Sequence, residues 1–262
     1  LDKRAGEIIY SSEVILVSSR LLEVFKGYEE FEKVKDRINV INNVDKTIEF
    51  IQSAIRNPLS AINNIVLLAS GDPLFFGIGR RAVKELGKDM VEVLPDLSSI
   101  QVAFARIKEA WDDAFLMSLH GGPDPGKRRR LPYEINDIPA LLQRHNKIAI
   151  LTDKENNPAE IARVIARSPY IIGTTTQSKD EIATPSVRND SIKMHVCERL
   201  GYKDEKVTEG TPEGIAGMIF GEPNVVVIQN IKHRAQNTEN PPSPPFSKGG
   251  MGGFADIGFG LK

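Results

Sequence analysis

The chain has 262 residues, of which 40% are hydrophobic, and it carries 34 Lys and Arg residues against 35 Asp and Glu residues. This length is enough for two modest domains, and the balanced charge argues against a surface built as a whole to bind nucleic acid or a membrane. One cysteine, Cys197, excludes a disulfide framework and a cysteine-based zinc site. No apolar run approaches the ~18 residues of a membrane span, and no signal peptide is visible, so we expect a soluble cytoplasmic protein.

Short apolar runs alternate with amphipathic segments over the first half of the chain. The pattern predicts strands over residues 13–17, 38–41, 65–69, 91–94 and 115–119. It predicts helices over residues 3–11, 45–56, 74–86 and 99–106. Such alternation is typical of an α/β fold with a mostly parallel sheet and helices on its faces. The continuous apolar run at residues 65–69 favours a strand that is buried on both faces.

The composition changes at residues 121–132, which read GGPDPGKRRRLP. Such a stretch continues neither a helix nor a strand. A second α/β unit follows, with strands predicted over residues 147–151, 193–196 and 224–228 and helices over residues 158–166 and 212–220. We therefore predict an N-terminal domain of residues 1–121, a linker of residues 122–138 and a smaller C-terminal domain of residues 139–231, with a ligand cleft between the domains.

Two further segments depart from this pattern. Residues 178–189 interrupt the second unit and are interpreted as a loop insertion. Residues 232–262 are rich in Pro, Gly and Ser, a composition that cannot bury enough apolar surface to fold. We predict a disordered tail there.

The most informative stretch is SGDPLFFGIGRR at residues 70–81, directly after the strand predicted at residues 65–69. Gly71 can adopt backbone angles that other residues avoid, Asp72 suits a helix N-cap, and Pro73 suits the first helical position. The pattern predicts a strand, a tight turn and a helix N-terminus. Ligands bind at the carboxyl ends of strands in open α/β sheets, so a ligand site is expected here. Taken alone, residues 70–73 are more simply explained as a well-made turn.

The longer string at residues 70–80 resembles the signature of the tetrapyrrole methylases. It is most similar to the cobalamin-pathway branch that methylates C5 of precorrin-7 or its cobalt form. Other blocks match in the same order within residues 1–230: RLL at 20–22, VEVLP at 91–95, SSIQ at 98–101, AFAR at 103–106, WDDA at 111–114, SLHG at 118–121, ERLGY at 198–202 and EGTPE at 209–213. Each block is weak alone, whereas the ordered set is specific.

The resemblance implies the two-domain tetrapyrrole methylase fold, S-adenosyl-L-methionine as the methyl donor and a tetrapyrrole (precorrin) substrate. Cobalt, if present, arrives inside the substrate, because the four histidines are dispersed and show no metal-ligand spacing. By resemblance, the residues that line the methyl-donor pocket are Gly71, Asp72, Phe75, Ser98 and Ser99, and the pocket is closed from the other domain by His120 and Gly210.

Two of these assignments have simpler explanations. Ser98 and Ser99 lie where a helix N-cap is expected, although a capping serine still leaves nearby backbone amides in place. His120 is the candidate for a catalytic base, but a lone histidine is usually structural or exposed. Attack by an electron-rich carbon on a sulfonium does not need a base, so positioning of the two reactants should supply most of the acceleration.

A precorrin carries many carboxylates, which Arg and Lys recognise well. We expect Arg80 and Arg106 to bind the substrate, Arg80 because it lies one helical turn past the ligand-facing loop. Arg81 and the basic run at residues 127–130 are further candidates, although a solvated linker loop explains the run better.

The start of the chain departs from the family pattern. The family begins with a strand and a Gly-x-Gly-Pro-Gly-type loop, whereas Leu1 lies where the following helix should begin. We therefore expect that strand and loop to be missing, which removes one wall of the cleft and exposes unpaired backbone groups.

Three alternative hypotheses about the function stay open besides C5 methylation. The chain methylates another macrocycle position, or it methylates rRNA or a diphthamide precursor, or it is a truncated, non-catalytic remnant. The resemblance also implies a homodimer for a complete protein, whereas it is the balanced charge that predicts no nucleic-acid or membrane partner.

Overall fold

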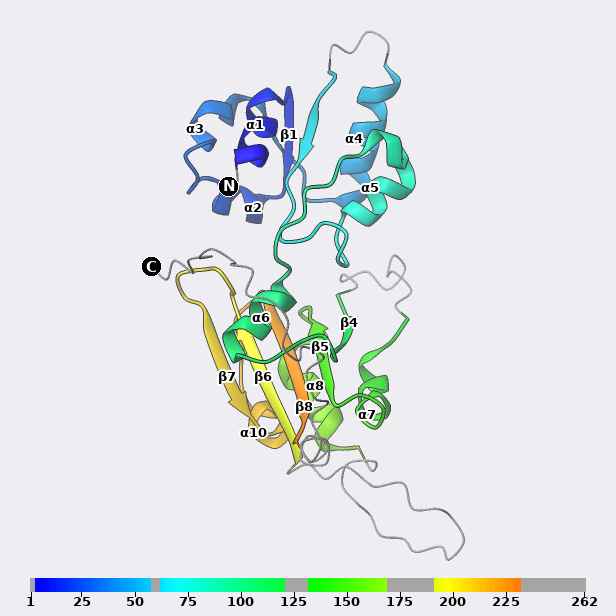
Figure 1. Ribbon diagram of the computed structural model, residues 1–262, viewed down its shortest axis with the longest axis vertical. Coiled ribbons are helices and arrows are strands. Elements are labelled where there is room, and N and C mark those ends of the chain that lie inside the picture. Colours follow the sequence, from blue (N-terminus) through cyan, green and yellow to red (C-terminus); the bar gives the residue numbers. More distant parts are fainter. Residues whose placement is uncertain (1–2, 58–61, 121–131, 169–190, 232–262) are drawn as a thin grey trace, which may run out of the picture.

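The computed structural model describes residues 3–57, 62–120, 132–168 and 191–231, which form two β-sheets with helices packed around them (Figure 1). The first sheet has three parallel strands in the order β2-β1-β3. β1 (Val14–Val17) is central, between β2 (Ile38–Val40) and β3 (Ile65–Leu67). Ile15 pairs with Ile38 on one side and with Val66 on the other. All four residues of β1 are buried.

Apolar side chains alternate between the two faces of β1, as the pleat of a strand requires. On one face the buried residues come from β1, α1 (Lys3–Ser11), α2 (Ser19–Phe25) and α3 (Phe31–Val34): Ile15, Ile9, Phe25 and Val34. On the other face they come from β1 and α4 (Val44–Arg56): Val14, Leu16 and Ile51. The helices therefore cover both faces of the sheet, which is the predicted α/β arrangement.

The second sheet has five strands in the order β4-β5-β8-β6-β7. β4 (Phe115–Ser118) and β5 (Lys147–Leu151) are parallel, whereas β8 (Asn224–Asn230), β6 (Ile192–Glu198) and β7 (Lys206–Gly210) pair antiparallel. Every residue of β8 is buried. The helices α7 (Ile138–Leu141), α8 (Pro158–Ala166) and α10 (Pro212–Ala216) contribute to the core on one face, and α6 (Ser99–Ile107) covers the other.

The chain passes from the first sheet to the second through residues 91–98, which lead into α6 (Figure 1). α6 packs on the second sheet, and β4 pairs with β5 so that Phe115 lies opposite Ile148. The predicted N-terminal domain of residues 1–121 is therefore wrong for α6 and β4, and the crossing comes before the predicted linker of residues 122–138. The alternation of strands and helices does not tell which sheet a strand will join.

The fold class is confirmed as α/β with a parallel first sheet and a second sheet, although within the described residues the second unit, expected to be the smaller, has more strands. Residues 132–138 of the predicted linker lead through a short 3-10 turn, Ile135–Asp137, into α7. The remainder of that linker, the predicted insertion at residues 178–189 and the predicted tail at residues 232–262 lie outside the described residues.

Several predicted elements differ from the observed ones. Residues 91–94 form no strand. β3 is half-buried rather than buried on both faces, because within the described residues it pairs on one side only. The helix predicted over residues 74–86 begins later, as α5 (Gly79–Leu86), and the helix predicted over residues 212–220 ends at Ala216.

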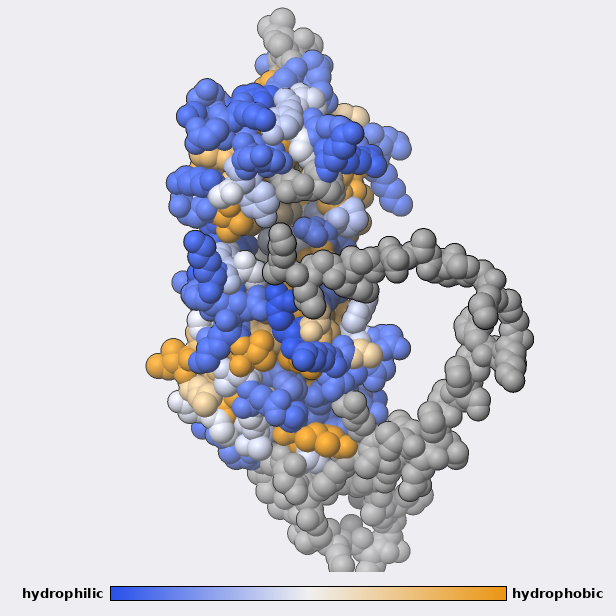
Figure 2. Space-filling model, turned by 60° about the vertical axis from the view of Figure 1, so that its left-hand side comes forward, coloured by the Kyte–Doolittle hydropathy of each residue, from blue (hydrophilic) through white to orange (hydrophobic). Residues whose placement is uncertain are grey.

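The described surface shows no broad apolar face in the view of Figure 2, where hydrophilic residues cover most of it and hydrophobic ones form small clusters. Among the described large hydrophobic residues, Ile219 after α10 is the most exposed, at 99%. In the described part of the chain, no helix combines the length and the hydropathy that crossing a bilayer demands. The predicted homodimer stays a prediction.

Candidate functional site

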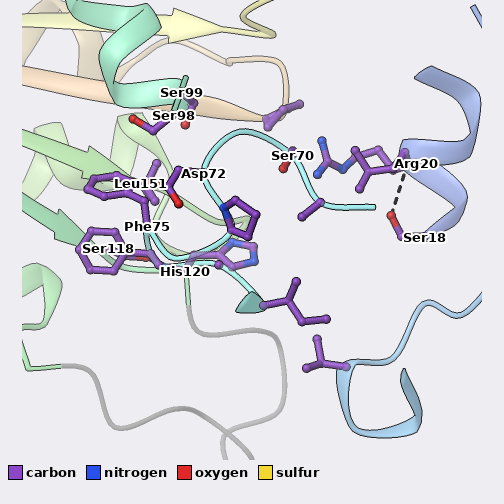
Figure 3. A pocket seen from close by; sticks show the side chains of 18 of the residues that line it. Ser18, Arg20, Ser70, Asp72, Phe75, Ser98, Ser99, Ser118, His120 and Leu151 are labelled. Carbon is purple, nitrogen blue, oxygen red and sulfur yellow. Dashed lines mark hydrogen bonds between the residues drawn. The ribbon is translucent and has the colours of Figure 1, made fainter. Parts of the chain in front are cut away.

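A cavity of about 530 Å³ lies where the two sheets meet, and Figure 3 shows side chains that line it. The first sheet contributes residues at or just beyond the carboxyl ends of its three strands, as an open parallel sheet is expected to do. These residues are Ser18, Arg20, Ile41, Asn42, Leu68 and Ser70. The second sheet and its loops contribute Ser118, His120, Leu151, Thr152, Cys197, Leu200, Asn224 and Val225.

The loop at residues 70–78 passes between these two walls and contributes Asp72, Phe75 and Phe76 to the lining. Asp72 does not cap a helix as predicted. Its carboxylate accepts a hydrogen bond from the backbone N–H of Leu74 at 2.8 Å, and α5 begins only at Gly79. Asp72 therefore closes a local turn, which is an alternative that short acidic side chains offer to the backbone.

Two glycines of this loop lie where a larger residue does not fit. Gly71 has φ +63°, and a Cβ atom there would lie 2.9 Å from the carbonyl oxygen of Leu97 and 3.2 Å from Cα of Ser98. At Gly77 a Cβ atom would lie 2.6 Å from the carbonyl oxygen of Pro73. Gly71 is thus the contact between the loop and the start of α6, although it does not itself line the cavity.

Phe75 fixes the loop against the second sheet. Its ring packs against the buried cluster formed by α6 and strands of that sheet, which includes Phe104 and Val225. It also makes an edge-to-face contact with Phe76, with 4.8 Å between the ring centroids. Because Phe75 both lines the cavity and packs on this core, the loop and the second sheet form one continuous wall.

Ser98 and Ser99 begin α6, and both line the cavity. Ser98 is the N-cap: its hydroxyl accepts from the backbone N–H of Gln101 at 3.2 Å, and the Gln101 side chain accepts from the Ser98 N–H at 2.9 Å. This reciprocal capping box satisfies two of the backbone donors that a helix N-terminus leaves unpaired. The N-cap explanation of the sequence is therefore confirmed, and the same residue faces the candidate ligand site.

The wall from the second sheet carries several short polar side chains. The hydroxyl of Thr152 donates to the backbone carbonyl of Asn224 at 2.7 Å, and the Asn224 side chain donates to the carbonyl of Gly221 at 2.8 Å. Ser118 accepts from the backbone N–H of His120 at 3.3 Å. These short polar side chains are fixed by the backbone, so their positions are set before any ligand binds.

His120 lines the cavity but is exposed, and its Nδ1 lies 3.4 Å from the carbonyl oxygen of Thr152. Among the described residues no carboxylate lies within ion-pair range of its ring. A base needs a partner that fixes its tautomer and raises its basicity. The Thr152 carbonyl is an acceptor that can fix the tautomer with Nδ1 protonated, but no carboxylate among the described residues supports the ring, so the role of His120 as a base stays a prediction.

Cys197 also lines the cavity but is fully buried. Burial raises the pKa of its thiol to about 12, and the nearby Glu205 carboxylate adds to the shift. The thiol therefore stays protonated near neutral pH and is not a nucleophile, because the thiolate is the reactive form. Within the described residues no group of His, Cys, Asp and Glu side chains could hold a metal ion.

Besides Gly71, three predicted site residues do not line this cavity. Gly210 ends β7, where it pairs with Met194 and packs close to Ile215 of α10. Arg80 is exposed on α5. Arg106, near the end of α6, forms an ion pair with Glu205, and its Nη2 also donates to Oε2 of that carboxylate at 3.3 Å. The predicted basic run at residues 127–130 lies outside the described residues.

The sequence analysis did not assign several residues that the structure brings into the cavity. They are Ser18, Arg20, Asn42, Ser118, Thr152 and Asn224. The position of most of them just after a strand was a usable signal, because ligands gather at the carboxyl ends of strands. Asn224 had no such signal, since it begins its strand.

With this geometry in place, comparison with known proteins defines the class. Residues 2–216 match the family described as Tetrapyrrole (Corrin/Porphyrin) Methylases. The chain belongs to this family, which makes it a methyltransferase.

Named relatives point to one branch of the family. A protein of Methanocaldococcus jannaschii named "Probable cobalt-precorrin-7 C(5)-methyltransferase" is 26% identical over 231 residues, which cover 87% of this chain and 91% of the relative. The cobalt-precorrin-7 C(5)-methyltransferase of Salmonella typhimurium is 39% identical over 104 residues, 39% of this chain and 45% of the relative.

Solved structures agree on the fold. The precorrin-6Y methylase of Archaeoglobus fulgidus is similar with a TM-score of 0.56 and 20% identity, covering 87% of this chain and 91% of that one. The uroporphyrin-III C-methyl transferase of Thermus thermophilus, solved with S-adenyl homocysteine, has a TM-score of 0.56 and 17% identity, covering 89% and 93%. At these identities the likeness shows the fold.

Proposed function

We propose that the chain transfers a methyl group from S-adenosyl-L-methionine to C5 of precorrin-7 or cobalt-precorrin-7, a step of cobalamin biosynthesis. The observation that carries the proposal is the cavity at the junction of the sheets, built from the loop at residues 70–78 and the start of α6. Relatives named as enzymes of this reaction supply the choice of acceptor.

The cavity fits a donor that combines polar and apolar parts. Its volume of about 530 Å³ lies within the range of small-molecule sites. Side chains of Phe75, Leu151 and Val225 supply apolar walls, and the hydroxyls of Ser98 and Ser99 supply short polar contacts. A sulfonium compound with a ribose and a purine needs such a mixture of apolar walls and few charges.

We assign Asp72, Phe75, Ser98 and Ser99 to holding the donor, with Gly71 keeping the loop close to α6. When bound, the donor supplies a methyl group on a positively charged sulfur, which is a good leaving group. The work of the protein is then to hold the acceptor carbon in line with that methyl group and to exclude water. Ser118, His120 and Thr152 lie on the wall that faces the loop and are placed to position an acceptor.

The proposal is tested first by donor binding. Titration of S-adenosylhomocysteine by calorimetry should show one site, and Phe75→Ala should weaken it because the apolar wall is lost. A matched control is Phe115→Ala, since Phe115 lies in the second sheet but does not line the cavity. Absence of binding to the unchanged, folded chain would contradict the donor assignment and favour a non-catalytic remnant.

Acceptor choice is tested by methyl transfer. Incubation with labelled S-adenosyl-L-methionine and a panel of precorrins should label precorrin-7 or its cobalt form, and mass spectrometry should find one added methyl group at C5. Labelling of a different macrocycle, of rRNA or of a diphthamide precursor would overturn the assignment of C5 while leaving the donor assignment in place.

A further inference from the structure

A second cavity adjoins the first and is bordered by basic side chains. Its volume is about 520 Å³, and its lining includes Arg20, Arg199, Tyr202 and Lys203. Arg20 and Pro223 line both cavities, so the second continues from the first. Arg20 extends from α2 toward the first cavity in Figure 3.

Two of these cations have no acidic partner among the described residues. Within the described residues, the Arg20 side chain donates through Nη1 to the hydroxyl of Tyr202 at 3.3 Å. Lys203 has no ion pair within the described part of the chain. Arg199, by contrast, pairs with Asp204 at 2.6 Å while its guanidinium lies over the ring of Tyr202, 4.6 Å from the centroid. Arg20 and Arg199 thus converge on one tyrosine from two directions.

The carboxylates around this cavity do not neutralise it. Glu23 lines it but pairs with Lys26 at 2.7 Å. Glu222 lines it as well, and its backbone carbonyl accepts from Arg199 at 3.1 Å. The three lining cations therefore face two lining carboxylates, one of which has its own lysine. Arg199 is paired with Asp204, so Arg20 and Lys203 face the one remaining lining carboxylate, that of Glu222, and the cavity keeps a net positive charge.

The turn at residues 199–205, which carries the Arg199, Tyr202 and Lys203 side chains, is fixed by the carboxylate of Glu205. The Glu205 carboxylate accepts from the backbone N–H of Gly201 at 2.7 Å and pairs with Arg106. The Arg106 guanidinium lowers the pKa of Glu205, and the hydrogen bond from Gly201 acts in the same direction. Arg106, which the sequence analysis assigned to the substrate, is therefore occupied in fixing the turn.

We propose that Arg20 and Lys203, supported by the Arg199–Tyr202 stack, form a subsite for the peripheral carboxylates of the macrocycle. This inference rests on the proposed function, because the acceptor named there is a polycarboxylate that extends beyond the donor. Unpaired guanidinium and ammonium groups at the edge of a cavity are the usual partners of carboxylates. The subsite replaces Arg80 and Arg106 as the site of substrate charge recognition.

Binding of a porphyrin that carries acetate and propionate side chains, followed by fluorescence, tests the subsite directly. Arg20→Gln and Lys203→Gln should each weaken binding about fivefold, the upper range for an exposed ion pair, and the double variant about 25-fold if the two act independently. Arg20→Lys should restore part of the loss. The same porphyrin with its carboxylates capped as neutral amides should bind all variants equally.

Two matched variants serve as controls. Arg56→Gln and Arg144→Gln remove exposed arginines that line neither cavity, and both should bind the porphyrin as the unchanged chain does. A loss in these variants equal to that in Arg20→Gln, or no loss in Arg20→Gln and Lys203→Gln, would overturn the subsite.

A further experiment tells whether Arg20 binds a carboxylate of the macrocycle or the carboxylate of the methyl donor. S-adenosylhomocysteine should bind Arg20→Gln with an affinity within about twofold of the unchanged chain. A larger loss for this ligand than for the porphyrin would assign Arg20 to the donor and overturn the proposal. If S-adenosylhomocysteine binds no variant while the porphyrin losses persist, the subsite stands and the proposed function fails.

Discussion

Replacing Gly71 with alanine should destabilise the chain and weaken donor binding together. The left-handed backbone at φ +63° costs a residue with a Cβ atom about 1–2 kcal/mol. The added Cβ atom would also lie 2.9 Å from the Leu97 carbonyl oxygen, which is backbone and cannot rotate away. Forcing that contact apart costs about 1–3 kcal/mol more. The expected loss in the free energy of unfolding is therefore about 2–5 kcal/mol.

The cost of the steric clash can be separated from the cost of the backbone conformation by comparison with a second glycine whose φ is also positive. Gly201 has φ +81°, and a Cβ atom there would meet nothing within 4 Å. Gly201→Ala should therefore cost the conformational part alone, about 1–2 kcal/mol. Urea denaturation measures both losses. Calorimetry with S-adenosylhomocysteine should then show about tenfold weaker binding in Gly71→Ala, because the loop at residues 70–78 moves away from Ser98.

Equal stability losses in the two variants would refute this reasoning, since the loop would then accept the extra atom without moving. Normal donor affinity in a destabilised Gly71→Ala chain would place the donor away from this loop.

Two further predictions concern the start and the end of α6. Ser98→Ala should cost about 1 kcal/mol of unfolding free energy through the lost cap, while Ser99→Ala, which removes an exposed hydroxyl, should stay within about 0.5 kcal/mol by urea denaturation. Glu205→Gln removes a carboxylate whose pKa is held below its ordinary value of 4.5, chiefly by Arg106. The stability that this carboxylate contributes, about 1 kcal/mol because the pair is partly exposed, is present above pH ~4.5 and is lost as the pH falls through the lowered pKa. Unfolding curves of the two chains should therefore differ at neutral pH and converge in acid.

Much of the architecture followed from apolar patterning. β1, α4, β5 and α8 lie within a residue or so of their predicted ranges, because each combines a clear apolar period with a cap or a turn at its ends. β7 was missed, because it is an edge strand whose Lys-Val-Thr-Glu-Gly sequence is largely exposed and carries no apolar alternation. The apolar pattern of a sequence reflects which residues are buried, and an exposed edge strand such as β7 has few buried residues.

The loop at residues 70–78 shows a different limit. Its sequence offered a good N-cap and a good first helical residue, and the local preferences of Asp72 and Pro73 were real. The chain uses them in turns instead, because Gly77 and Gly79 fold back over Pro73, and the N–H of Gly79 donates to the Pro73 carbonyl at 2.9 Å. Local residue preferences thus identified which residues determine the loop, but they did not predict the backbone conformation that these residues adopt together.

The cavity itself shows why half of a site can be read from a sequence and half cannot. The residues that the first sheet contributes could be predicted, because the carboxyl ends of parallel strands all lie at the same edge of a sheet and ligands bind at that edge. This prediction needs only the positions of the strands along the chain. Asn224 lies opposite these residues only because β8 runs antiparallel to β5, with Leu151 paired to Val225. That direction is decided by how β8 packs between β5 and β6, a contact between segments far apart in the chain. A polar residue at the beginning of a strand therefore becomes a site residue only once the sheet is assembled, and Thr152, which donates to its carbonyl, acquires its role in the same step.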